Sequence, residues 1–146
     1  MAAGDHGGQD GLQETTRPLR VLVDTNVALD QLLQRDPWYA IAQPFWRARD
    51  AGRLVAYLSA STLTDVSYIG RRHAGPAQAR QAVERYLREF GLVPLSRAVL
   101  EAALALGGPD FEDDVQIACA PLAGLDLIVT RGAPWRPCTA GWGWPR

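Results

Sequence analysis

One stretch near the amino end limits what this chain can fold into: residues 20–27 read Arg-Val-Leu-Val-Asp-Thr-Asn-Val. A short β-branched apolar run ends in an acid, a hydroxyl and an amide, and a helical pattern follows. Such a run is typical of a buried strand in a parallel sheet, which places Asp24 at its carboxyl end, where open α/β sheets bind ligands. The alternative is that Asp24, Thr25 or Asn26 only caps the next helix.

Length and composition favour a single domain. A chain of 146 residues can bury one real core but is short for two ordinary domains. It has no apolar run long enough to span a bilayer and no signal-like start, so we expect a cytoplasmic protein without a membrane partner. Its two cysteines, Cys119 and Cys138, are not spaced as metal ligands, and His6 and His73 are isolated, so a zinc site is not expected.

All 15 basic side chains are arginines, because the sequence contains no lysine. That excludes Schiff-base chemistry, a P-loop lysine and a phospho-acceptor receiver domain that relies on one. With a formal net charge of −1, nucleic-acid binding would depend on local arginine patches such as Arg71 and Arg72. Their alternative role is to lie on a solvated helix face and pair with acids.

Strand and helix patterns alternate along the chain. Strands are expected over residues 20–24, 54–58, 92–95 and 125–129. Helices are expected over residues 26–33, 37–52, 76–90, 97–105 and 110–122, and a further one starts from a cap at Ser61 or Thr62. In the helix over 37–52, Asp36 is the expected N-cap and Pro44 is expected to kink or split the helix. The pattern predicts a three-layer α/β/α domain over residues 19–131 with a mostly parallel sheet of about four strands. Residues 1–18 are expected to form a disordered tail, and the Gly, Pro and Trp-rich residues 132–146 an irregular one.

Acidic residues fall at three places that this fold could bring together. Asp24 ends the first strand, Asp65 lies on the helix after the second, and four of the five residues 110–114 are acidic. A helix dipole favours acids in its first turn, but like charges this close repel unless a cation lies among them. If the three places converge above the sheet, they form an oxygen-rich pocket suited to Mg²⁺ or Mn²⁺. The alternatives are a dipole-stabilised helix start and, for Asp65, a solvated side chain.

These motifs, in this order and spacing, resemble the PIN-domain family. Many of its members are ribonucleases, including the VapC-like toxins of toxin–antitoxin pairs. The resemblance rests on residues 21–27, 110–116 and 127–131, and it covers about residues 20–131. It implies a PIN-like fold, Mg²⁺- or Mn²⁺-dependent hydrolysis of RNA phosphodiester bonds, a small antitoxin protein as partner and, as one option, a homodimer.

The resemblance also implies roles for individual residues. Asp24 and Asp113 match metal-binding acids, and Asp65 and Thr130 complete the catalytic set. Asp65 stands where the family usually has the longer glutamate, and Thr130 matches the hydroxyl at the end of the last strand. The supporting residues are Asn26, Glu112 and Asp114, and the candidate nucleic-acid contacts are Arg71, Arg72 and Arg131.

The chain departs from the family pattern after Arg131. Relatives continue with an aspartate or asparagine and then a short Asp-Phe segment, whereas residues 132–135 here read Gly-Ala-Pro-Trp and offer no side chain that binds a metal. Two interpretations therefore stay open. One is a metal-dependent endoribonuclease whose activity is impaired by the missing fourth acid, and the other is a PIN-like domain that binds RNA or protein without cleaving.

Overall fold

A single sheet with the strand order β3-β2-β1-β4-β5 organises the computed structural model, which describes residues 17–131 and 136–137. The strands are β1 (Leu19–Val23), β2 (Leu54–Ser59), β3 (Gly91–Val93), β4 (Leu127–Val129) and β5 (Arg136–Pro137). The first four run parallel to one another, and the two-residue β5 is antiparallel to β4. All four parallel strands therefore place their carboxyl ends at one edge of the sheet.

Strand β1 lies at the centre of the sheet, which explains why its sequence is apolar on both faces. Val21, Leu22 and Val23 are all 0% exposed. Because side chains alternate across a strand, Val21 and Val23 pack into the core on one face while Leu22 packs into the core on the other. The N–H of Asp24 still donates to the carbonyl of Val129 at 3.0 Å, and there the chain leaves the sheet at its carboxyl edge.

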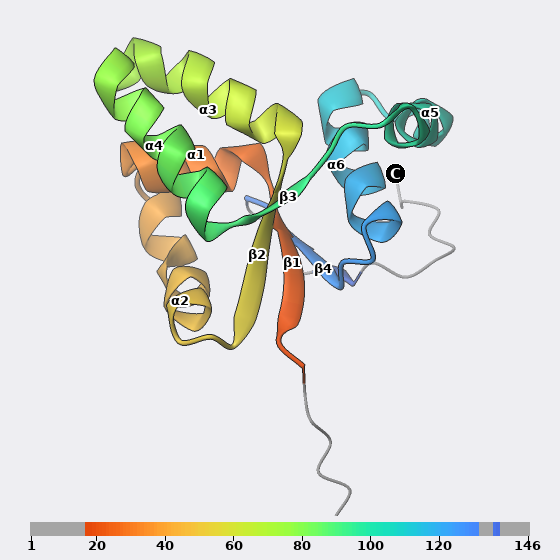
Figure 1. The fold of residues 1–146 in the computed structure, drawn as a ribbon, viewed down its shortest axis with the longest axis horizontal. Helices are drawn as coiled ribbons and strands as arrows, with labels where there is room; N and C mark the ends of the chain where they lie inside the picture. Colours follow the sequence, from red (N-terminus) through yellow and green to blue (C-terminus); the bar gives the residue numbers. More distant parts are fainter. Residues whose placement is uncertain (1–16, 132–135, 138–146) are drawn as a thin grey trace, which may run out of the picture.

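Helices cover both faces of the sheet (Figure 1). The helices of the described part of the chain are α1 (Thr25–Leu33), α2 (Trp38–Asp50), α3 (Ala60–His73), α4 (Pro76–Glu89), α5 (Arg97–Leu106) and α6 (Phe111–Leu122). Figure 1 shows α1 to α4 on one side of the sheet and α5 and α6 on the other. This arrangement confirms the predicted three-layer α/β/α fold. Within residues 17–131, no helix combines the length and the apolar character that crossing a membrane would need.

The positions of proline in two helices differ from what the sequence pattern predicts. Helix α2 has Pro37 as its N-cap, so the prediction of Asp36 at that position was wrong by one residue. Of the predicted kink or split at Pro44, the split was wrong, because α2 runs through this residue. Pro44 removes the donor for the carbonyl of Ala40, and both residues are exposed, so water can satisfy that carbonyl. Pro121 similarly lies inside the last turn of α6.

The strand ends also differ from the predicted ranges. The third strand is Gly91–Val93 rather than 92–95, because Pro94 has no N–H to donate to a neighbouring strand. The fourth begins at Leu127 rather than at Leu125, whose N–H bonds back to the carbonyl of Ala120 at the end of α6. Strand β5 falls within the region predicted to be irregular. Residues 1–16, 132–135 and 138–146, which include most of both predicted tails, lie outside the described residues.

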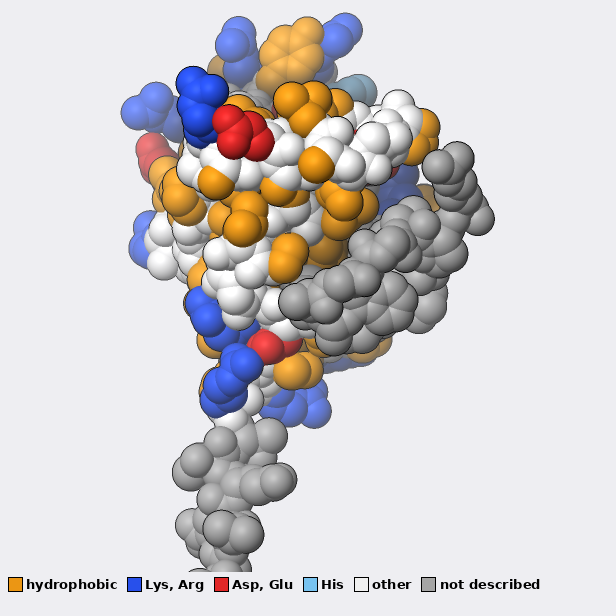
Figure 2. All heavy atoms as spheres, turned by 90° about the vertical axis from the view of Figure 1, so that its right-hand side faces the viewer, with side chains coloured by type: hydrophobic (Ala, Val, Ile, Leu, Met, Phe, Trp, Pro, Cys, Tyr) orange, Lys and Arg blue, Asp and Glu red, His pale blue; other side chains and the backbone are white. Residues whose placement is uncertain are grey.

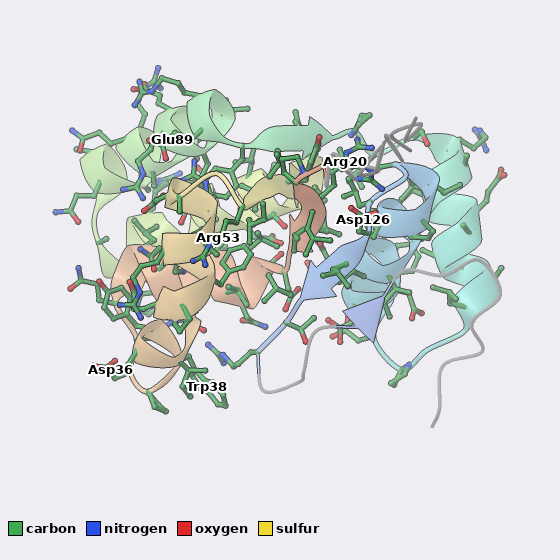
Figure 3. The ribbon with its side chains drawn as sticks, turned by 90° about the horizontal axis from the view of Figure 1, so that it is seen from below. Arg20, Asp36, Trp38, Arg53, Glu89 and Asp126 are labelled. Atoms are coloured by element: carbon green, nitrogen blue, oxygen red, sulfur yellow. The ribbon has the colours of Figure 1, made fainter. Side chains whose placement is uncertain are left out.

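At the amino edge of the sheet, one carboxylate holds the start of β1. Asp126 accepts hydrogen bonds from both terminal nitrogens of Arg17, at 3.0 and 2.8 Å, and from the N–H of Arg20 at 2.8 Å. Figure 3 shows Arg20 and Asp126 together at this edge. The hydrogen bonds from Arg17 and then from the Arg20 backbone lower the pKa of Asp126. The acid at this edge is thus compensated by arginine.

The two layers of the core give a direct test of how β1 is held. Leu22→Ala should lower the free energy of unfolding by about 2–5 kcal/mol, because it opens a cavity beside α5 and α6. The control is Leu104→Ala on the outer face of α5, where Figure 2 shows apolar side chains at the surface and Leu104 is 69% exposed. That change should cost no more than about 0.5 kcal/mol in urea unfolding. Equal costs for the two changes would contradict this packing.

Candidate functional site

Asp24 occupies the N-cap position of α1 without serving as a side-chain cap. Its backbone is extended, with φ −64° and ψ 149°, as an N-cap requires. No side-chain hydrogen bond from Asp24 caps the helix, however. Side-chain capping therefore does not account for an acid at the end of β1.

The surroundings of Asp24 disfavour its charge. Burial is the largest cause and raises the pKa of Asp24 to about 6. The N–H of Thr25 and the charge of Arg131 act against this rise, whereas the charges of Asp113 and Asp30 add to it. At neutral pH this carboxylate is ionised at a cost in free energy, and a bound cation would relieve that cost.

Helix α6 brings its acids to the same edge through its own cap. Asp110 is the N-cap, and its carboxylate accepts from the N–H groups of Glu112 at 2.9 Å and Asp113 at 3.5 Å. Asp110 therefore stabilises the start of the helix, which is the role that the alternative interpretation gave to all four acids of residues 110–114. Asp113 acts electrostatically on Asp24. Its own pKa is raised by partial burial first, and then by Asp110 and Asp114.

Asp65 lies near the other acid of this turn, Glu112. The negative charge of Asp65 is the largest cause raising the pKa of Glu112, ahead of burial and of Asp110 and Asp113. Burial raises the pKa of Asp65 itself, so it is not a fully solvated helix residue. The three acidic places of the sequence therefore form two interacting pairs, Asp24 with Asp113 and Asp65 with Glu112. The adjacency of Glu112 and Asp113 joins the pairs.

The other predicted site residues are not members of these two pairs. Asp114 is 7% exposed and accepts a hydrogen bond from the N–H of Gly108 at 2.8 Å, so it holds the loop between α5 and α6. Asn26 is exposed in the first turn of α1, and Thr130 follows β4 and is partly buried. Within the described chain, neither Asn26 nor Thr130 has a hydrogen bond to the acids.

The arginines proposed to contact nucleic acid are divided between two places. Arg71 and Arg72 are exposed in the last turn of α3, about 18 Å along the helix from its first turn at the acid edge. The guanidinium of Arg72 lies 5.9 Å from the ring centroid of Tyr68. Arg131 lies near the acids, but it is paired. Its Nε donates to Asp30 Oδ2 at 3.0 Å, and its guanidinium carbon lies 5.4 Å from the ring centroid of Trp38. The structure does not bring Arg71 or Arg72 to the acids.

Asp30 is the residue of this region that the sequence patterns missed. It is 1% exposed on α1, and both of its oxygens accept from the Arg131 guanidinium, while Arg35 Nε lies 2.9 Å from Oδ1. Two arginines thus compensate one buried carboxylate, which would otherwise be strongly destabilising. The pair fixes the end of β4, where Thr130 lies, against α1. The one signal of Asp30 in the sequence is that this acid directly follows three apolar residues, 27–29.

The acids suit a hard divalent cation, although they do not form a complete cage for one. Within the described residues, no three His, Cys, Asp or Glu side chains are arranged to hold an ion between them. Mg²⁺ commonly keeps several waters and uses only one or two protein carboxylates. Asp24 and Asp113, which are close enough to repel each other, are a pair of this kind. Their oxygen donors and unfavourable charge fit Mg²⁺ or Mn²⁺.

The sequence matches the PIN domain family over residues 20–132. The chain belongs to the PIN-domain family. A search of curated protein sequences gave no match for this PIN domain.

Solved toxin structures share its fold. VapC20 of Mycobacterium tuberculosis, described as a sarcin–ricin loop cleaving toxin, is 16% identical, with a TM-score of 0.62 over 74% of this chain and 86% of that one. VapBC2 of Rickettsia felis, bound to promoter DNA, is 13% identical, with a TM-score of 0.58 over 78% and 89%. A toxin–antitoxin complex from Klebsiella pneumoniae is 22% identical, with a TM-score of 0.57 over 77% and 86%. At these identities the likeness establishes the fold.

The raised pKa of Asp24 predicts how stability depends on pH without metal. Its folded pKa of about 6 exceeds that of an unfolded chain, so the cost of ionising it is absent below about pH 4, grows as pH rises to about 6 and is complete above that. Asp24→Asn should therefore raise the free energy of unfolding near pH 7, by at most about 3 kcal/mol, and change it little near pH 4.

Urea unfolding in a chelator across this range of pH measures the effect. Asp50→Asn is the matched control, because Asp50 is on the surface with its side chain 69% exposed. The same pH profile in wild type and Asp24→Asn would show that Asp24 is not held in an unfavourable charge state.

Proposed function

We propose that this PIN domain is a metal-dependent endoribonuclease that hydrolyses RNA phosphodiester bonds as the toxin of a toxin–antitoxin pair in the cytoplasm. The observation that carries the proposal is the meeting of two acid pairs at the carboxyl edge of the sheet, where Asp113 helps to raise the pKa of Asp24. Acids without a capping or arginine partner at a ligand-binding edge are expected of a cation site. The similar folds of VapC20, described as a cleaving toxin, and of the Klebsiella toxin–antitoxin complex agree with this function.

We assign each residue a role in that activity. Mg²⁺ or Mn²⁺ bound at this edge would supply charge stabilisation for the phosphate and activation of water. Asp24 and Asp113 hold the ion, and Asp65 is the further catalytic acid. Glu112 supports Asp65 as a neighbouring carboxylate, whose pKa the charge of Asp65 raises. Thr130, fixed by the neighbouring pair of Arg131 with Asp30, offers its hydroxyl at the end of β4.

The proposed partners follow from the same assignment. RNA reaches the acids at the sheet edge, and the exposed Arg71 and Arg72 contact its backbone farther along α3. Arg131 acts as a tethered positive charge near Asp24 rather than as a mobile phosphate ligand. A small antitoxin protein is the proposed partner, which agrees with the Klebsiella toxin–antitoxin complex, and a homodimer is one option for the form of the toxin.

A second function is favoured by one observation. Within residues 17–131, no set of three potential ligands is arranged around a common ion position. A PIN-like domain with such an incomplete site could bind RNA or protein without cleaving it. Cleavage, and not binding, separates this candidate from the nuclease.

The test is cleavage of a labelled RNA pool with Mn²⁺, Mg²⁺ or a chelator. Asp24→Asn and Asp113→Asn should each lower the metal-dependent rate by more than about 100-fold, since even outer-shell partners of a metal typically contribute 10–100-fold. The matched control is Asp110→Asn, which removes a charge from the same turn but keeps a good N-cap, and its rate should stay close to that of wild type.

RNA binding without metal-dependent cleavage in the wild type would favour the binding module. Cleavage that Asp24→Asn and Asp113→Asn leave intact would place the activity elsewhere in the chain or in a contaminant.

A further inference from the structure

A buried hydrogen-bond network joins the three elements that carry the acids. Gln116 of α6 is 6% exposed, and its Nε2 donates to Ser59 Oγ at 2.9 Å and to Thr62 Oγ1 at 3.3 Å. Thr62 Oγ1 lies 2.8 Å from Thr25 Oγ1. Ser59 and Thr62 are both 0% exposed. The network therefore spans from α6 through the start of α3 to the start of α1.

Each part of this network lies beside an acid on its own element. On α1, the network residue Thr25 directly follows Asp24. On α3, Thr62 precedes Asp65 by three residues, and on α6, Gln116 follows Asp113 by three. Residues three apart lie on the same face of a helix, about one turn from each other. The separations within the network consequently set the separations between the acids.

The carboxamide of Gln116 gives the network a direction. An amide NH₂ donates and accepts none, so the hydroxyls of Ser59, Ser61 and Thr62 are its acceptors and their own hydrogens point to other partners. Thr62 can then donate to Thr25, and Ser59 to Ser61, whose Oγ lies 2.9 Å away. Every hydroxyl between the helices thus has a partner.

Packing alone does not explain a glutamine at this position. Its Oε1 is buried and has no hydrogen-bond partner within the described chain. A buried amide oxygen left unpaired is unfavourable, and an apolar side chain of similar shape would avoid that cost. What the apolar side chain could not provide are the directional bonds from α6 to the start of α3.

We propose that Gln116 is a positioning residue that holds Asp24, Asp65 and Asp113 at the spacing that a divalent cation requires. The inference rests on the proposed function. The hydrogen bonds of Gln116 to Ser59 and Thr62, and the contact of Thr62 with Thr25, tie together the elements that carry these acids. Hydrogen-bonded groups behind a metal's ligands commonly set its affinity, and small displacements of such ligands are costly.

The experiment compares Gln116→Met with wild type, using Mn²⁺ alone as the probe. The substitution keeps the length of the side chain and removes the hydrogen bonds that Nε2 donates to Ser59, Ser61 and Thr62. Thermal unfolding over a range of Mn²⁺ concentrations should show an affinity at least about tenfold weaker than that of wild type. In the RNA assay, kcat at a fixed Mn²⁺ concentration should fall while KM changes little, because the proposed RNA contacts lie elsewhere.

Gln43→Met is the matched control. Gln43 Nε2 also makes two internal hydrogen bonds, to Gln31 Oε1 at 3.1 Å and to the Tyr39 carbonyl at 2.9 Å, but its network carries none of the site acids. This change should lower the metal-free melting temperature and leave Mn²⁺ affinity at the wild-type value. Thr62→Val, which replaces one hydroxyl with a methyl group, provides a second break in the network if Gln116→Met does not fold.

The outcomes separate this inference from the function on which it rests. A wild type that binds Mn²⁺, with folded Gln116→Met or Thr62→Val variants that bind it equally well, would overturn the positioning role and leave the nuclease intact. A wild type that neither gains stability from Mn²⁺ nor cleaves RNA would overturn both. Equal weakening in Gln116→Met and Gln43→Met would show a general loss of stability and would also overturn the positioning role.

Discussion

Repulsion between carboxylates is the constraint on which the arrangement at the carboxyl edge of this sheet depends. There the charge of Asp113 adds to the burial that raises the pKa of Asp24, and the charge of Asp65 raises that of Glu112. Side chains on flexible segments would move apart under this repulsion. Here each acid is carried by an element that is fixed for other reasons: β1 is buried on both faces, and the helices that carry the other acids have side-chain N-caps. Packing of the two cores therefore supplies the stability that holds the acids together.

Arginine compensates two acids of this domain that lie outside the site pairs. Asp126 at the amino edge is compensated by Arg17, and the buried Asp30 by Arg131 and Arg35. Neither acid of the Asp24–Asp113 pair has an arginine partner among the described residues. Arg131 connects the two groups, because it is bound to Asp30 and its charge also lowers the pKa of Asp24. A tethered guanidinium thus offsets part of the repulsion before any metal binds.

The sequence predicted those features that have a local cause. The apolar run before Asp24 predicted the central strand, and the crowded acids before Val115 predicted a helix start that exceeds the needs of capping. The local pattern could not predict that Asp113 and Asp114 have different roles. Consecutive helix residues point in different directions, and Asp114 accepts a hydrogen bond from the loop at Gly108. Asp30 escaped notice because one of its two arginine partners, Arg131, lies 101 residues away in the chain.

The network under the acids could not be predicted for a related reason. Gln116, Thr62 and Thr25 look like ordinary polar residues of three separate helices, and only the sheet order brings them together. In the same way, Pro44 predicts a helix break from its missing N–H, but the exposure of the affected turn lets α2 continue. Exposure and contacts across the sheet are tertiary properties that residue spacing does not encode.

Paramagnetic broadening by Mn²⁺ in amide NMR spectra of the full chain tests most directly whether the acids at this edge form a cation site. At substoichiometric Mn²⁺, the account predicts that the amides around Asp24 and Asp113 broaden first. The amide of Asp126, about 13 Å away along the strands at the compensated edge, should broaden later. Broadening that begins at Asp126, or that affects acids over the whole surface equally, would contradict a cation site at the carboxyl edge.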